Sequence, residues 1–282
     1  MQSTLQKTLN LGPQPIHPPP TSLSGRVALV VGGALGIGRA VSRALAHGGC
    51  KRVIMVNRSR EQGDEAKAFI EGDMPEELRG QEKGEGEGVE VEWVGCDMGN
   101  LKQVREVFTK LREGLDRLDY LVLSAGINAN QYGLDADGID QHFGVNYLGQ
   151  FYVVNLLWPV LRKTAKMEGQ QWNKPRVVFE SSEVHRLAPG NVHFASLEEI
   201  NDDELGPTEL YARTKLAMIL LAKYGLAGKV VQENGEEVVA VAVHPGAVSA
   251  PNLIVEWVHE PELTKYRSIL PCSSSGRRRI RD

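Results

Sequence analysis

The sequence predicts an α/β fold: a single domain built on a doubly wound parallel sheet. Short apolar runs typical of buried strands alternate with amphipathic stretches of helical length. A glycine-rich turn, Gly32-Gly-Ala-Leu-Gly36-Ile-Gly38, follows the first run and opens the first helix. Repeated strand–helix units need crossover connections, and right-handed crossovers place successive strands parallel to one another.

The first half of the chain supplies three strands. Residues 27–31 and 53–56 are continuous apolar runs, as expected of strands buried on both faces. Residues 89–94 alternate apolar and polar side chains, which indicates a strand with one exposed face. Amphipathic patterns predict a helix from the glycine turn through Ala46 and another over 61–70.

The second half continues the alternation and raises the number of strands to six. The expected strands cover 120–123, 176–179 and 238–243. The expected helices cover 101–115, 143–166 and the segment that carries Tyr211. These units complete one sheet with helices on both faces.

Two stretches interrupt this alternation, and two further segments lie at the ends. Residues 72–88 are rich in glycine and glutamate, which predicts a solvated loop. Residues 186–207 are either a plain surface loop or a cover over the active-site mouth. We expect a flexible proline-rich arm over 1–22, a cofactor-binding domain over 23–250, and an atypical, shortened tail over 251–282.

Composition excludes several classes of protein. The chain has 282 residues and a formal net charge of −4, so it lacks the basic field of a nucleic-acid-binding protein. The three cysteines have no metal-ligand spacing, which predicts no metal and a reducing, cytoplasmic compartment. A mitochondrial leader is the weaker alternative, because Lys7 is the one basic residue near the start. No apolar run reaches the ~18 residues of a membrane span.

Tyr211 and Lys215 stand four residues apart on a predicted helix and therefore share one face. A neighbouring ammonium favours the phenolate, so we expect Lys215 to lower the pKa of Tyr211 from its ordinary value near ~10. A phenol tuned in this way can exchange a proton during a carbonyl–alcohol interconversion. The same spacing also arises by chance on exposed helices.

The glycine turn has the context of a nucleotide-binding loop, although a turn required only for packing is the alternative. Its glycines let backbone N–H groups approach a pyrophosphate at the start of a helix. The second strand ends in Asn57-Arg58 and lacks the carboxylate that would accept the ribose hydroxyls of NAD. We therefore expect NADP(H) in preference to NAD(H), with Arg58 on the extra phosphate. An exposed arginine at a loop start is the structural alternative.

Further motifs follow the later strands in order. They are Cys96-Asp97-Met98, Ser124-Ala-Gly126, Gly144-Val-Asn146, Glu180-Ser-Ser182 and His244-Pro-Gly246. Each has a structural alternative, such as a turn-forming Asp97, a strand-end cap at Ser182 or a surface asparagine at 146. Their joint occurrence in order at the ends of consecutive strands is what favours a binding site.

With these motifs the chain resembles the short-chain dehydrogenase/reductase family, in its retinol-dehydrogenase-like and fungal oxidoreductase branch. The resemblance implies a Rossmann-type fold and a catalytic set of Asn146, Ser182, Tyr211 and Lys215. It also implies cofactor contacts through Gly32, Gly36, Ile37, Gly38, Asn57, Arg58, Asp97, Met98, Ser124, Ala125, Gly126, Tyr211, Lys215, Pro245, Gly246 and Val248.

The mechanism implied by the resemblance is hydride transfer with the cofactor. Ser182 would hold the substrate oxygen, and Tyr211 would give or remove its proton. Lys215 would bind the nicotinamide ribose, and Asn146 would support a water in a proton relay. The expected function is an NADP(H)-dependent oxidoreductase acting on a lipophilic or polyketide-like carbonyl or alcohol. The alternative is a non-catalytic cofactor-binding or interaction protein of the same descent.

Some positions depart from the family pattern. Val31 and Ala250 stand where threonine is usual, and Leu123 and Ser124 replace two asparagines. We expect these changes to alter cofactor affinity rather than abolish the chemistry. No apolar strand is evident in the tail after Pro251, so we expect six strands with one open edge, an incomplete substrate pocket and weakened homo-oligomer contacts.

Overall fold

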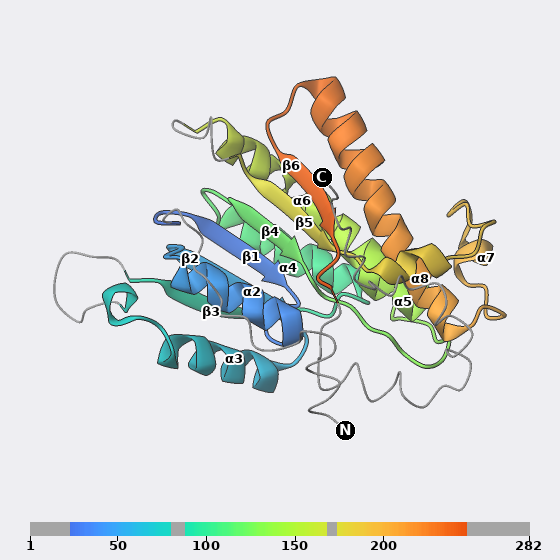
Figure 1. The fold of residues 1–282 in the computed structure, drawn as a ribbon, viewed down its shortest axis with the longest axis horizontal. Helices are drawn as coiled ribbons and strands as arrows, with labels where there is room; N and C mark the ends of the chain where they lie inside the picture. Colours follow the sequence, from blue (N-terminus) through green and yellow to red (C-terminus); the bar gives the residue numbers. More distant parts are fainter. Residues whose placement is uncertain (1–22, 80–87, 168–173, 247–282) are drawn as a thin grey trace, which may run out of the picture. The chain divides into compact units, whose positions relative to one another are not determined.

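The computed structural model describes residues 23–79, 88–167 and 174–246. These residues form a six-stranded parallel sheet in the order β3-β2-β1-β4-β5-β6 (Figure 1). The strands are β1 (Val27–Val31), β2 (Arg52–Asn57), β3 (Glu90–Gly95), β4 (Tyr120–Leu123), β5 (Arg176–Glu180) and β6 (Val239–Val243). The predicted doubly wound α/β fold is therefore confirmed.

Helices connect consecutive strands. They are α2 (Gly36–His47), α3 (Arg60–Gly72), α4 (Leu101–Glu113), α5 (Gln141–Phe143), α6 (Gly149–Ala165), α7 (Leu197–Ile200) and α8 (Pro207–Leu220). Several begin where a polar side chain caps the first turn: Ser59 accepts a hydrogen bond from the Gln62 N–H, and Asn100 accepts one from the Gln103 N–H. Pro207 occupies the first turn of α8, where its missing N–H costs no helix bond.

The order in which successive strands are added across the sheet changes direction at β1. This strand pairs with β2 on one side, where Val31 faces Val56, and with β4 on the other, where Val31 faces Leu123. Ligands of open α/β sheets bind outside the carboxyl ends of the strands at such a switch point. The fold therefore places the candidate site where β1, β4 and β5 end.

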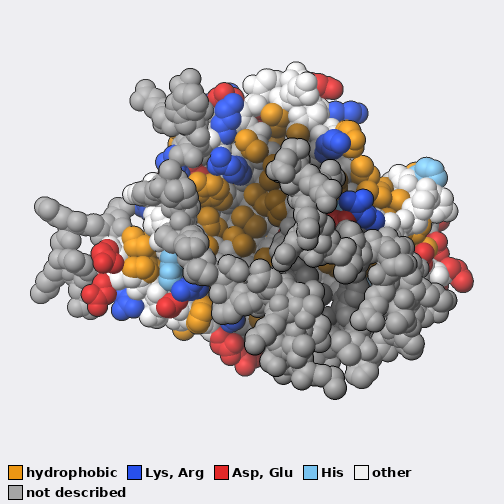
Figure 2. All heavy atoms as spheres, viewed as in Figure 1, with side chains coloured by type: hydrophobic (Ala, Val, Ile, Leu, Met, Phe, Trp, Pro, Cys, Tyr) orange, Lys and Arg blue, Asp and Glu red, His pale blue; other side chains and the backbone are white. Residues whose placement is uncertain are grey.

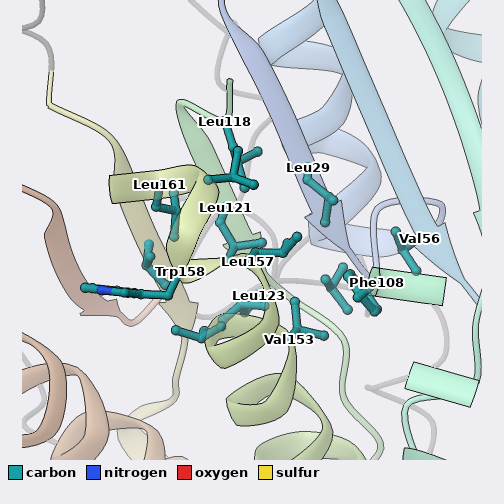
Figure 3. Packing of buried hydrophobic residues seen from close by; sticks show 14 of the residues in the cluster. Leu29, Val56, Phe108, Leu118, Leu121, Leu123, Val153, Leu157, Trp158 and Leu161 are labelled. Carbon is teal, nitrogen blue, oxygen red and sulfur yellow. The ribbon is translucent and has the colours of Figure 1, made fainter. Parts of the chain in front are cut away.

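Alternate residues of β1 enter two different hydrophobic cores. Leu29 packs with Phe108 of α4 and Leu157 of α6 in the larger core, and Figure 3 shows these side chains converging around Leu121 and Leu123. Ala28 belongs to the smaller core instead, together with buried side chains of α2, α3 and β2. This double burial explains why the run over 27–31 is apolar at every position.

The long helix expected over 143–166 differs in the structure. It consists of α5, a π-helical segment η2 (Gly144–Leu148) and α6. A second π segment, η5 (Leu221–Gln232), continues from α8. Single π turns inside α-helices widen the hydrogen-bond spacing and are frequent at functional sites.

The two expected loops contain helical turns. The first includes η1 (Glu76–Leu78), and the second contains α7 and overlaps the last two residues of η4 (Glu183–Leu187). The predictions for the arm over 1–22, the tail over 251–282 and the missing last strand concern residues outside those described. Within the described ranges, no helix is long and apolar enough to cross a bilayer.

Candidate active site

The glycine turn is folded so tightly that side chains do not fit. Gly32 has φ +82°, and a Cβ there would lie 2.5 Å from the backbone nitrogen of Ala125. A Cβ on Gly38 would lie 2.1 Å from the carbonyl oxygen of Gly32. Gly36 also has a positive φ, of +54°, but open space around it. A Cβ on Gly33 would lie 2.8 Å from the Val30 carbonyl oxygen, so the turn needs glycine for conformation at two positions and for space at three.

This turn presents the start of α2 to the switch point. The residue before the helix, Leu35, is apolar and gives no side-chain cap to the first N–H groups of α2. Ile37 is half-buried in the same turn. Uncapped N–H groups beside a close-packed glycine backbone fit a dinucleotide pyrophosphate.

The ends of β2 and β3 meet at a surface arginine. The Arg58 side chain is 81% exposed, and its Nη1 lies 3.8 Å from Oδ2 of Asp97. The Asn57 amide is engaged within the protein: it accepts a hydrogen bond from Trp93 Nε1 and donates to the carbonyl of Ser59. The guanidinium is thus open to a ligand at this edge.

The loop after β4 links the glycine turn to the rest of the site. A Cβ on Gly126 would lie 3.4 Å from Asn146 Oδ1 and 3.7 Å from Lys215 Nζ. The neighbouring Ala125 contacts Gly32 and accepts a hydrogen bond from Gln150. Met98, by contrast, is a buried member of the larger core. Sequence reasoning placed it among the cofactor contacts, and its packing role is the contact that the structure records.

Asn146 lies in η2 and is completely buried. Its Oδ1 accepts the Ile127 N–H at 2.7 Å, while its Nδ2 donates to the Ile127 carbonyl at 2.9 Å and to Thr214 Oγ1 at 3.3 Å. The side chain therefore joins the loop after β4 to α8. It is not the surface asparagine considered as an alternative.

Lys215 points to the carboxyl end of β5. Its Nζ donates to the Glu180 carbonyl at 2.8 Å and lies 5.2 Å from the centre of the Tyr211 ring. Burial lowers the pKa of Lys215 to about 8. A lysine with a reduced pKa can lose and regain a proton near physiological pH.

The expected direction of the Tyr211 pKa is wrong. Burial and, to a smaller extent, the nearby Glu180 carboxylate raise this pKa to about 12. Lys215 lies over the face of the ring, and its effect does not offset the loss of hydration around the phenol. In this structure Tyr211 is therefore a group that holds its proton firmly.

The two serines after β5 have different surroundings. Ser181 is buried and donates a hydrogen bond to the Lys215 carbonyl at 2.8 Å. Ser182 is half-buried and caps η4, where its Oγ accepts the Val184 N–H at 3.3 Å. The strand-end cap considered for Ser182 is thus present, and this accepted bond leaves its hydroxyl proton available for a substrate oxygen.

The end of β6 lies beside these serines, because the Ser181 N–H donates to the Val243 carbonyl at 2.8 Å. Pro245 and Gly246 follow after His244, and Gly246 has φ +85°. Val248 and Ala250, by contrast, lie outside the described residues.

Sequence reasoning missed a buried ion pair behind the site. Asp140 and Arg213 are 0% and 1% exposed, and Arg213 Nη2 donates to the Asp140 carboxylate at 3.2 Å. Arg213 also donates to the carbonyls of Glu199 and Ile200, which attaches α7 to α8. His142 Nδ1 lies 3.3 Å from the other carboxylate oxygen. Neither residue belongs to a sequence pattern that could have indicated the pair.

Replacement of Arg213 by methionine is expected to lower the free energy of unfolding by about 3–5 kcal/mol, since it leaves the buried Asp140 carboxylate without its cation. Urea unfolding followed by circular dichroism measures this change. The matched control is Arg186→Met, which removes an exposed ion pair with Glu183 and should change little. Equal losses in the two variants would contradict the expectation.

Comparison with known proteins places these features in a family. Residues 26–184 match the family model described as short chain dehydrogenase. The chain is 36% identical over 242 residues to a Neurospora crassa protein named as the mitochondrial oxidoreductase bli-4, covering 85% of this chain and 55% of that protein. It is 31% identical over 251 residues to human retinol dehydrogenase 14, covering 87% of this chain and 68% of the relative.

The fold has solved counterparts. A crystal structure of an uncharacterized protein from Mycobacterium paratuberculosis superposes with a TM-score of 0.60 at 27% identity, covering 83% of this chain and 73% of that one. The chain spans little more than half the length of bli-4, so the relatives contain sequence that this chain does not match.

Proposed function

Because the chain belongs to the short-chain dehydrogenase family, we propose that it is an NADP(H)-dependent oxidoreductase that interconverts a carbonyl and an alcohol. One observation carries the proposal: Lys215 Nζ reaches the Tyr211 ring, Gly126 and the end of β5 within one cluster beside the glycine turn. A proton-exchanging phenol next to a pyrophosphate site is the arrangement that hydride transfer to a carbonyl requires.

A bound nicotinamide supplies or accepts the hydride, and the protein handles the proton. In reduction, the Ser182 hydroxyl donates a hydrogen bond to the substrate oxygen, and the Tyr211 O–H gives that oxygen its proton as the C–O double bond becomes single. Lys215 returns a proton to Tyr211 and holds the ribose. Asn146 fixes the loop after β4 in register with α8, which keeps these groups together.

The preference for NADP(H) is supported by the exposed Arg58 and the absence of a carboxylate at the end of β2. Arg58→Ala is expected to weaken NADPH binding by about ten- to a hundredfold, because a charge-assisted hydrogen bond contributes about 1.5–3 kcal/mol. Isothermal titration with NADPH and with NADH separates the two cofactors, and NADH affinity should stay the same.

The control for this measurement is Arg60→Ala, which removes an exposed arginine stacked over the Trp93 ring at 4.8 Å. It should leave the ratio of the two affinities unchanged. Equal weakening of NADPH and NADH in Arg58→Ala would contradict the assignment of Arg58 to the phosphate.

We propose a lipophilic carbonyl or alcohol as the substrate. Val241 and Val243 of β6 are 38% and 41% exposed, and β6 ends beside Ser181. Figure 2 shows hydrophobic side chains gathered on one face of the molecule. Retinol, which the name of one relative specifies, belongs to this chemical class. A cytoplasmic location remains our proposal, and the two described cysteines, Cys50 and Cys96, are free thiols that suit a reducing compartment.

A panel of aliphatic, terpenoid and aromatic aldehydes and ketones, followed by NADPH absorbance, tests the activity. Consumption of NADPH that depends on one of these carbonyls supports it. Tight NADPH binding without turnover across the panel would favour the non-catalytic alternative instead.

A further inference from the structure

Glu180 is a carboxylate at the carboxyl end of β5, after three apolar residues and directly before the two serines of the site. It is half-buried, and the hydroxyl of Ser124, at the end of the neighbouring β4, donates a hydrogen bond to its carboxylate. On its other side, β6 presents Val243 in register with it. Within the described residues, the Ser124 hydroxyl is thus the hydrogen-bond donor recorded for this carboxylate.

Glu180 is also hydrogen-bonded to Lys215 of α8, which lies over the Tyr211 ring. Its backbone carbonyl accepts the Lys215 ammonium at 2.8 Å, and that ammonium lies 5.2 Å from the centre of the Tyr211 ring. Glu180 thus connects β4, β5 and α8 through two hydrogen bonds, one at its carboxylate and one at its backbone.

The Glu180 carboxylate acts in the same direction on the pKa of both titratable side chains near it, Tyr211 and Lys215. Tyr211 and Lys215 are the titratable side chains of α8 near it, Ser124 is its neighbour on β4, and Val243 is its neighbour on β6. A carboxylate near a phenol and an ammonium stabilises the protonated form of both. The pKa of Tyr211 is raised first by burial and then by Glu180, and that of Lys215 is lowered by burial against a rise from Glu180.

We propose that Glu180 is a positioning residue that keeps the proton on Tyr211 and the charge on Lys215, so that the site works as a proton donor over a wide range of pH. The proposal rests on the proposed carbonyl chemistry. In reduction, Tyr211 must start protonated, and a fixed anion nearby keeps it so at alkaline pH. In oxidation, Tyr211 must start as the phenolate. The same anion therefore raises the pH at which oxidation begins.

The test is Glu180→Gln, which keeps an acceptor for Ser124 and removes the charge. The titration of Tyr211 is followed by NMR of protein containing isotope-labelled tyrosine, with the signal assigned by its loss in Tyr211→Phe. The midpoint should fall by about one pH unit or more, the size of effect that a nearby charge exerts. In the pH profile of alcohol oxidation, the midpoint of the rise in rate at alkaline pH should move to lower pH by the same amount.

Two controls separate charge from structure. Glu180→Asp keeps the anion and should keep the midpoint near that of the original protein. Glu183→Gln removes an exposed carboxylate of η4, close by in sequence, and should leave the titration unchanged. If Glu180→Gln does not fold, Glu180→Leu, which suits the neighbouring apolar strand, replaces it.

An unaltered Tyr211 midpoint in a folded, uncharged variant would overturn the proposal. This result is distinct from failure of the proposed function, because the NMR titration needs no substrate. Failure of the proposed function would instead appear as tight NADPH binding by the original protein without turnover of any carbonyl in the panel.

Discussion

Turnover of the Tyr211→Phe variant is expected to fall by about a thousandfold, within the range for loss of a general acid or base. The change removes one oxygen, and with it the proton that the substrate oxygen receives. The ring that lies beneath the Lys215 ammonium remains, so the local packing is kept. Single-turnover measurements with saturating NADPH detect the loss, and a thermal shift with NADPH shows whether the cofactor still binds.

Tyr224→Phe is the matched control for this variant. Tyr224 is 57% exposed in η5, which continues from α8, and Lys223 also lies over its ring. Removal of this hydroxyl should leave turnover unchanged. If Tyr211→Phe were as active as Tyr224→Phe, the phenol could not be the proton donor.

The second large effect is expected for Gly38→Ala. The new Cβ would lie 2.1 Å from the Gly32 carbonyl oxygen and 2.8 Å from the carbon of the same group. Both are backbone atoms that cannot move aside, so the turn has to open. We expect NADPH binding to be lost and the free energy of unfolding to fall by about 1–3 kcal/mol, the usual cost of overpacking.

Calorimetric titration with NADPH and urea unfolding measure these two effects. Gly190→Ala is the control, because a Cβ at this exposed loop position meets no atom within 4 Å. Unchanged NADPH affinity in Gly38→Ala would mean that the turn does not hold the pyrophosphate.

The strands could be predicted from the sequence because burial on both faces leaves a direct trace in it. The run over 27–31 is apolar throughout, and the observed β1 covers the same residues. The location of the candidate site could also be predicted from the order of the strands, because residues that end adjacent parallel strands meet at one edge of the sheet. At this edge Gly126, in the loop after β4, lies close to Asn146 of η2 and Lys215 of α8.

What could not be predicted depends on contacts that leave no periodic signal. The Asp140–Arg213 pair joins residues 73 positions apart, and neither position belongs to a recognisable pattern. The π turn at 144–148 is defined by backbone bonding and not by side-chain order. The pKa of Tyr211 was predicted in the wrong direction because helical spacing gives proximity to Lys215 but does not give the extent of burial.

The π segment also lets the direction of Asn146 be set independently of the directions of the core residues of α6, which a regular helix would not allow. In an unbroken α-helix, consecutive residues are about 100° apart around the axis, so the direction of Asn146 would dictate the directions of Val153 and Leu157. The widened turn resets this phase, which lets Asn146 bond to Ile127 and Thr214 while Val153 and Leu157 still enter the core. Substitutions that repack α6 against the sheet can therefore accumulate without turning the asparagine out of alignment.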